Sequence, residues 1–111
     1  MNEIIYLEPD EDIAGVISRV KPVAKRAVCL VVPRGASISQ SVINLRLLKR
    51  EIEKMGKIVS LVTKDKISRN LASQVGITVY STVSEAKNAR VDQTEYSEAG
   101  TEKDEEGFSS S

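Results

Sequence analysis

The chain has 111 residues, with no histidine, no tryptophan and one cysteine. Without histidine, Ser-His-Asp and Cys-His catalytic arrangements lack their base, and a single cysteine forms neither an internal disulfide nor a zinc site. Residues 1–89 hold 14 Lys and Arg against 9 Asp and Glu, a net charge of +5, whereas residues 90–111 hold 2 against 7, a net charge of −5. We therefore expect one small domain followed by an acidic segment, with no catalytic residues, no metal and no cofactor.

The first third of the chain predicts two strands separated by a helix. A short apolar run over residues 4–7 predicts the first strand, and Asp10 is the expected N-cap of the helix that follows. One helical face is indicated by apolar residues at positions i, i+3, i+4 and i+7, namely Ile13, Val16, Ile17 and Val20. Residues 27–32 form an unbroken apolar run that includes Cys29, which is typical of a strand covered on both faces in a parallel sheet.

The rest of the first 89 residues repeats this alternation. Ser37 or Ser39 is the expected cap of the longest helix, which ends near Met55, just before Gly56. The remaining elements are expected to be a strand over 58–62, a short helix capped by Asp65, a strand over 77–80 and a last helix that begins at Ser81 or Thr82.

Strands and helices that alternate at these lengths are typical of a parallel sheet with helices packed on it. We therefore predict a three-layer α/β domain over residues 1–89, with about four mostly parallel strands alternating with helices. The runs 27–32 and 58–62 are the most continuously apolar, which places them at the centre of the sheet. The first and fourth strands are expected at its edges. Cys29 is expected to be a small buried residue.

Residues 90–111 have a different composition. Val91 and Phe108 are their only strongly apolar residues, and Ser, Glu, Asp, Thr and Gly dominate. Such a segment buries too little apolar surface to offset its chain entropy. We therefore predict a disordered acidic tail or linker over 90–111, and the alternative that the chain is a piece of a longer protein stays open.

The sequence contains no signal for membrane insertion or secretion. No run approaches 18 consecutive apolar residues, and the first eight residues show neither a basic leader nor a long apolar stretch. A cytoplasmic location is the resulting expectation.

A candidate ligand site lies where the predicted strands end. Ligands of open parallel sheets bind beyond the carboxyl ends of the strands. The loop over 33–37 combines a glycine with hydroxyl residues ahead of a predicted helix start, where free backbone N–H groups favour an anion. The candidate residues for a phosphate or nucleotide ligand are Arg34, Gly35, Ser37, Thr63, Lys64 and Asp65. An ordinary tight turn is the alternative, because the segment matches neither the P-loop nor the dinucleotide fingerprint.

Two further clusters of charge lie outside this candidate site. The acids at 8–12 offer oxygen ligands to a divalent cation, but acids are expected at a helix start because of its dipole, and we predict no metal there. The basic residues map to the opposite, amino-end edge of the sheet and are candidates for nucleic-acid binding. They are Lys25, Arg26, Lys49, Arg50, Lys54 and Lys57. The alternative is that they stabilise helix C-termini and solvate the surface.

Two stretches resemble a family of uncharacterised bacterial proteins that come largely from small-genome candidate phyla. The first runs from Val31 to Ser37 and continues over 40–50, and the second covers 57–65, 69–72 and 75–77. The resemblance spans residues 1 to about 82. It implies a Rossmann-like domain that precedes a linker and a membrane-anchored region, and it brings no established activity.

These observations together favour a non-catalytic binding or interaction module. The resemblance implies that this module is the cytoplasmic domain of a larger membrane-associated protein. Its expected partner is a protein or a second copy of the chain. A nucleotide- or phosphate-binding domain is the first alternative, and nucleic-acid binding through the basic edge is the second. The sequence leaves open the identity of the ligand or partner and the oligomeric state.

Overall fold

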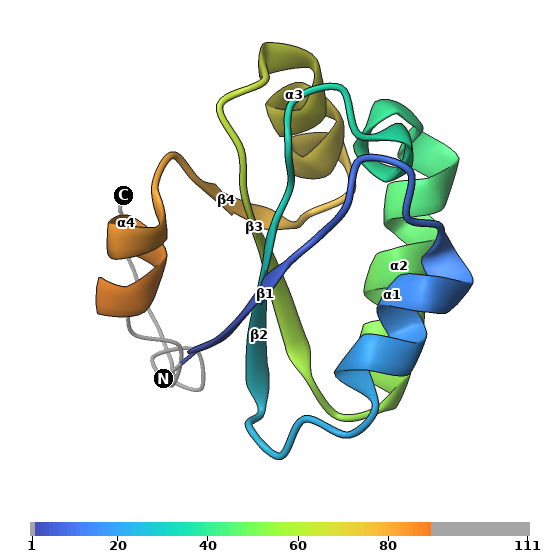
Figure 1. The fold of residues 1–111 in the computed structure, drawn as a ribbon, viewed down its shortest axis with the longest axis vertical. Coiled ribbons are helices and arrows are strands. Elements are labelled where there is room, and N and C mark those ends of the chain that lie inside the picture. Colours follow the sequence, from blue (N-terminus) through green and yellow to red (C-terminus); the bar gives the residue numbers. More distant parts are fainter. Residues whose placement is uncertain (1, 90–111) are drawn as a thin grey trace.

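The computed structural model describes residues 2–89 of the chain (Figure 1). Strands and helices alternate along it, as the sequence predicts. The elements are β1 (Asn2–Tyr6), α1 (Ile13–Val20), β2 (Ala27–Val31), the 3₁₀ helix η1 (Ser37–Gln40), α2 (Val42–Lys54), β3 (Ile58–Val62), α3 (Lys66–Gln74), β4 (Thr78–Tyr80) and α4 (Val83–Asn88).

The four strands form one parallel sheet in the order β1-β2-β3-β4. Cys29 of β2 lies between Ile4 of β1 and Ser60 of β3 in the register. The two most apolar strands, β2 and β3, occupy the centre, and β1 and β4 are the edges. This placement confirms the prediction, because only a strand with neighbours on both sides and helices over it needs apolar side chains throughout.

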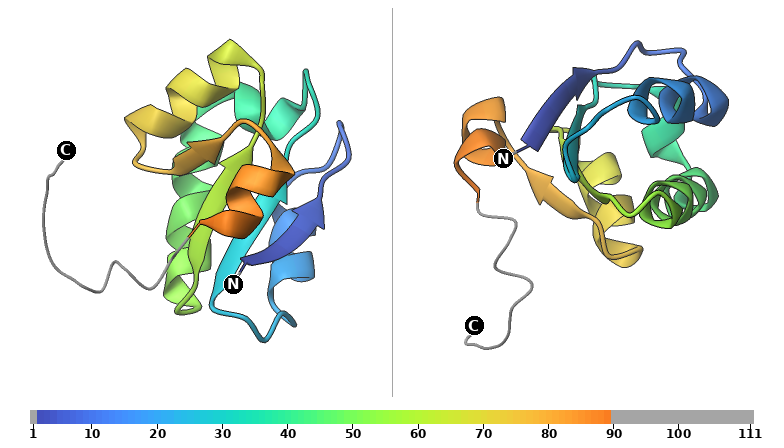
Figure 2. Two further views of the ribbon diagram at one scale, coloured as in Figure 1. Left: turned by 90° about the vertical axis from the view of Figure 1, so that its left-hand side faces the viewer. Right: turned by 90° about the horizontal axis from the view of Figure 1, so that it is seen from below.

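The sheet is the middle of three layers. Helices α1, α2 and α3 pack over one face, and α4 is the only helix of residues 2–89 on the other, as the view from below makes plain (Figure 2). The predicted three-layer, Rossmann-like α/β arrangement is confirmed, with one layer much thinner than the other. Because α4 has six residues, it covers only part of its face of the sheet.

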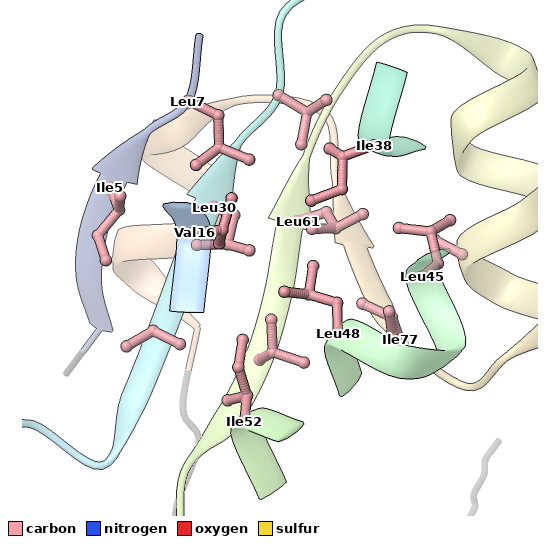
Figure 3. Packing of buried hydrophobic residues seen from close by; sticks show 14 of the residues in the cluster. Ile5, Leu7, Val16, Leu30, Ile38, Leu45, Leu48, Ile52, Leu61 and Ile77 are labelled. Atoms are coloured by element: carbon pink, nitrogen blue, oxygen red, sulfur yellow. The ribbon is translucent and has the colours of Figure 1, made fainter. Parts of the chain in front are cut away.

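The main core fills the space between the sheet and α1–α3. Figure 3 shows Leu30 and Leu61 of the central strands on the face of the sheet that Val16 of α1 and Leu48 of α2 cover, and all four are fully buried. A smaller apolar cluster on the second face joins Cys29 and Val62 to Ala86 of α4. Successive residues of a strand point to opposite faces, so β2 contributes to both clusters. Cys29 is buried as predicted, and this burial raises the pKa of its thiol.

Two predicted helix caps are wrong, and both are displaced along the chain. Asp12, not Asp10, caps α1, and its Oδ1 accepts a hydrogen bond from the Gly15 N–H at 2.8 Å. Ser41 caps α2 with its Oγ 3.3 Å from the Asn44 nitrogen. The predicted cap positions, Ser37 and Ser39, are taken up by the short helix η1, which precedes α2.

Two further predictions concern the C-terminal segment and membrane spans. The disordered acidic tail predicted for 90–111 lies outside the described residues. Within residues 2–89, none of the helices is both long and apolar enough to pass through a membrane.

Candidate functional site

A crevice opens at the carboxyl edge of the sheet, where the chain leaves β3 and β4 in opposite directions. The segment after β3 leads to α3 on one face, and the segment after β4 leads to α4 on the other (Figure 1). Neighbouring strands whose connections part in this way leave a space between the loops, which is where ligands of open α/β sheets bind. The crevice has a volume of 270 Å³ and is lined by Val31, Val32, Arg34, Val62, Thr63, Lys64, Asp65 and Ser81.

Two cationic side chains lie on the rim of this crevice. Arg34 comes from the loop after β2, and Lys64 comes from the loop after β3. Both residues are exposed, and within residues 2–89 neither side chain makes an ion pair or a hydrogen bond. Both charges are therefore available to a ligand.

The floor of the crevice is apolar and fixed by the sheet. Val31 and Val62 are partners in the β2–β3 register. Next to them Thr63 is buried, and its Oγ1 accepts a hydrogen bond from the Asp65 N–H at 3.1 Å. The backbone N–H of Thr63 donates to the carbonyl of Tyr80 at 3.1 Å. The loop that carries Lys64 is therefore held at its start by both neighbouring strands.

Arg69 ties the two diverging loops together, and the sequence did not predict this role. Its Nη1 donates to the carbonyl oxygen of Thr63 at 2.9 Å and lies 3.1 Å from the Oγ of Ser81. These atoms belong to the loops after β3 and β4. The only signal in the sequence was the position of Arg69 in the first turn of α3, four residues after Asp65.

Asp65 forms the third charged part of the rim, and its carboxylate is already well supplied with donors. Its Oδ2 lies 2.8 Å from the Ser68 hydroxyl and 2.8 Å from the Gln40 Nε2, and its Oδ1 accepts from the Ile67 N–H at 3.3 Å. The hydrogen bonds from Ser68 and Gln40 lower the pKa of Asp65, outweighing its slight desolvation. Asp65 is therefore ionised at neutral pH, and its carboxylate is hydrogen-bonded to other residues of the domain.

The same network positions the loop that bears Arg34. The buried hydroxyl of Ser68 lies 2.7 Å from the Oγ of Ser39, which in turn lies 3.2 Å from the carbonyl of Ala36. A buried polar network in which each group has a partner restricts local motion. The two cation-bearing loops are thus joined beneath the surface.

Gly35 and Ser37, the other two candidates from the sequence, lie outside the crevice. Gly35 forms the turn with φ of +78°, a conformation that favours glycine. The N–H of Ser37 donates to the carbonyl of Pro9 at 3.1 Å. The structure therefore has no free α-helix start at this point, because η1 has four residues and its first N–H is already used.

The acidic loop after β1 lies beside Ser37. A hollow of 280 Å³ there is lined partly by Asp10, Glu11 and Asp12. Glu11 pairs with Arg19 at 2.8 Å, and Asp12 caps α1. Among residues 2–89, no three His, Cys, Asp or Glu side chains gather closely enough to hold a metal ion.

The predicted basic surface is engaged mostly within the protein. Lys25 pairs with Glu3 at 3.6 Å, Lys49 with Glu53 at 2.8 Å, and Lys54 with Glu51 at 3.2 Å. Lys57 donates to the carbonyls of Val23 and Lys25, so it closes the loop before β2. Arg26 and Arg50 are exposed. Three of these six basic residues therefore have a carboxylate partner, and nucleic-acid binding at this edge stays a prediction.

Comparisons of the chain with protein-family models, with curated proteins and with solved structures gave no match. The crevice combines two cationic side chains that make no ion pair within residues 2–89, a small apolar floor and loops held by hydrogen bonds. Such a combination can attract an anion by charge and bind it by hydrogen bonding.

Proposed function

We propose that the domain is a non-catalytic binding module, and that its ligand is a small phosphate-bearing molecule held at the carboxyl edge of the sheet. One observation carries the proposal: Arg34 and Lys64, from different loops, line the same crevice, and within residues 2–89 neither makes an ion pair. A guanidinium group binds two phosphate oxygens at once, and an ammonium group adds a mobile point charge.

The size of the crevice limits the ligand. Its 270 Å³ is near the lower end of small-molecule sites, which span roughly 300–1,000 Å³. A phosphate group with a sugar-sized substituent suits this volume better than a dinucleotide. The apolar floor of Val31 and Val62 offers the substituent a surface to pack against.

The carboxylate of Asp65 does not cancel the attraction of Arg34 and Lys64 for a phosphate group. Its carboxylate accepts hydrogen bonds from Gln40, Ser68 and the Ile67 N–H, so its charge is partly satisfied before any ligand arrives. Two cations then act against one internally bonded carboxylate. The crevice retains a positive character at neutral pH.

The test is the affinity of the full chain for ribose 5-phosphate, measured by calorimetry. We expect saturable 1:1 binding that Arg34→Gln and Lys64→Gln each weaken by about tenfold or more, the cost of one charge-assisted hydrogen bond. Arg46→Gln is the matched control, because Arg46 is exposed on α2 and does not line the crevice. Affinity that is equal in all four proteins, or no binding at all, would refute the proposal.

The setting of this module is also a proposal. The resemblance described above supports a cytoplasmic domain of a larger membrane-associated protein, and a free buried cysteine is compatible with a reducing compartment. Cell fractionation with an antibody against the domain tests this directly. Recovery from an extracellular or periplasmic fraction would rule it out.

A further inference from the structure

Among residues 2–89, strand β1 has a neighbouring strand on one side only, so the backbone groups on its other side are paired with no strand there. The Leu7 N–H donates to the carbonyl of Val31 in β2 at 3.0 Å. The backbone N–H and C=O groups of successive residues point to alternate sides of a strand. Those of Ile5 therefore also point towards β2, whereas those of Asn2, Ile4 and Tyr6 point away from the sheet. Arg19 Nη2 reaches the Tyr6 carbonyl at 2.8 Å, in agreement with this assignment.

A groove runs along this open edge, between β1 and α4. The two elements lie side by side in both views of Figure 2, and Asn2 Nδ2 donates to the carbonyl of Ala86 at 2.7 Å. The groove has a volume of 440 Å³ and is lined by Asn2, Glu3, Ile4, Tyr6, Lys25 and Lys87. Tyr6 is 60% exposed, although it lies on the same face as Ile4. An aromatic side chain and a groove are therefore both left open on one edge strand.

We propose that a second copy of this chain occupies the groove, with the two β1 strands antiparallel about a two-fold axis at Ile4. The three outward residues suit this arrangement because they are centred on Ile4. Ile4 pairs with Ile4 of the second copy, and Asn2 pairs with Tyr6 of the second copy. Each such pair of facing residues exchanges two backbone hydrogen bonds. The Tyr6 carbonyl has a second lone pair, so Arg19 does not prevent the pairing.

The antiparallel direction also fills the groove. Tyr6 of the second copy lies opposite Asn2, next to the groove wall that Lys87 provides. Its ring is removed from water there and comes within reach of an ammonium group, which is attracted to an aromatic face. Each protomer thus supplies the side chain that covers the other's groove.

Charge favours the same direction. Glu8 and Asp10 are exposed just after the carboxyl end of β1, whereas Lys87 lies near its amino end, beside the pair formed by Lys25 and Glu3. Antiparallel pairing brings the acidic end of one copy to the basic end of the other, and parallel pairing brings like charges together. A single edge strand buries little area, so the dimer is expected to be weak and dependent on concentration.

The first test is sedimentation of the full chain over about 10 μM to about 1 mM, the range in which a weak dimer dissociates. We expect the dimer fraction to rise with concentration, and Tyr6→Ala to weaken association by about tenfold or more, as for loss of an aromatic interface side chain. Ile67→Ala is the control, because Ile67 is 57% exposed but lies on α3. A chain that is monomeric throughout, or equal effects of the two substitutions, would overturn the proposal.

The second test locates the contact. Facing residues of a hydrogen-bonded antiparallel pair have Cα atoms about 5.5 Å apart, which is within the range that a disulfide spans. Ile4→Cys is therefore expected to give a covalent dimer in oxidised glutathione, whereas Thr78→Cys on the other edge strand, β4, is not. Cys29 does not interfere because it is fully buried. Equal cross-linking at both positions would contradict pairing through β1. A complex that forms only with a different protein would also overturn the proposal, because the groove would then bind that protein and not a second copy of the chain.

Discussion

At the scale of single residues, Asp65 shows how a rim carboxylate is fixed by its donors. Ser68 and Gln40 each approach its Oδ2 at 2.8 Å, and these hydrogen bonds lower its pKa. We expect Ser68→Ala to raise the pKa of Asp65 towards the ordinary value of about 3.9, because the strongest donor is lost. A pH titration of the carboxyl carbon by NMR measures this, and an unchanged midpoint would show that the Ser68 hydroxyl does not support the charge.

The same shift has a consequence for stability. The folded-state pKa of Asp65 is below its unfolded value, so the group contributes stability that is present at pH above the unfolded pKa. This contribution is lost as the pH falls through the lower, folded-state pKa. Ser68→Ala is therefore expected to narrow the difference in stability between neutral and acidic pH.

At the scale of the elements, the caps decide where the helices begin. Ser41 Oγ accepts from the Asn44 N–H, whereas Ser37 makes no side-chain cap to η1. We expect Ser41→Ala to lower the free energy of unfolding by about 1 kcal/mol, and Ser37→Ala to change it by less than about 0.5 kcal/mol, as for an ordinary surface position. Urea unfolding of both variants measures the difference. A larger loss at Ser37 would mean that α2 is stabilised from η1 instead.

The sequence predicted the strands better than the helix starts. The apolar run over 58–62 matches β3 because a central parallel strand needs apolar side chains on both faces. The predicted caps, Ser37 and Ser39, and the observed cap, Ser41, have the same side chain and lie within five residues of one another. Only the 3₁₀ turn over the first two, which depends on packing against the rest of the fold, selects the third.

The sequence also predicted part of the lining of the crevice. Arg34, Thr63, Lys64 and Asp65 line it because parallel strands bring their carboxyl ends to one edge. Gly35 and Ser37 do not line it, because the chain turns away into η1. The bridge from Arg69 to Ser81 was not predictable, since it depends on the position of β4 and on α4 taking the opposite face.

At the scale of the whole molecule, α4 is the only described element over the second face of the sheet. Its Ala86 is fully buried against Cys29 and Val62, whereas the neighbouring Lys87 is exposed. We expect Ala86→Glu to lower the free energy of unfolding by roughly 3 kcal/mol or more, because it buries an unpaired charge. Lys87→Glu serves as the control and is expected to have little effect on the monomer. Thermal unfolding at low concentration measures both, and similar melting temperatures would mean that α4 does not hold this face.

The crevice itself depends on this whole-molecule arrangement. It exists because α3 and α4 follow adjacent strands on opposite faces, and Arg69 joins the two loops at their bases. The most direct measurement is therefore an amide NMR titration of the full chain with ribose 5-phosphate. We predict chemical-shift changes at residues 31, 32, 34, 62–65 and 81, which line the crevice. Shifts centred on the amino-end residues around Arg50 and Lys57, or spread evenly over the domain, would contradict a phosphate site at the carboxyl edge.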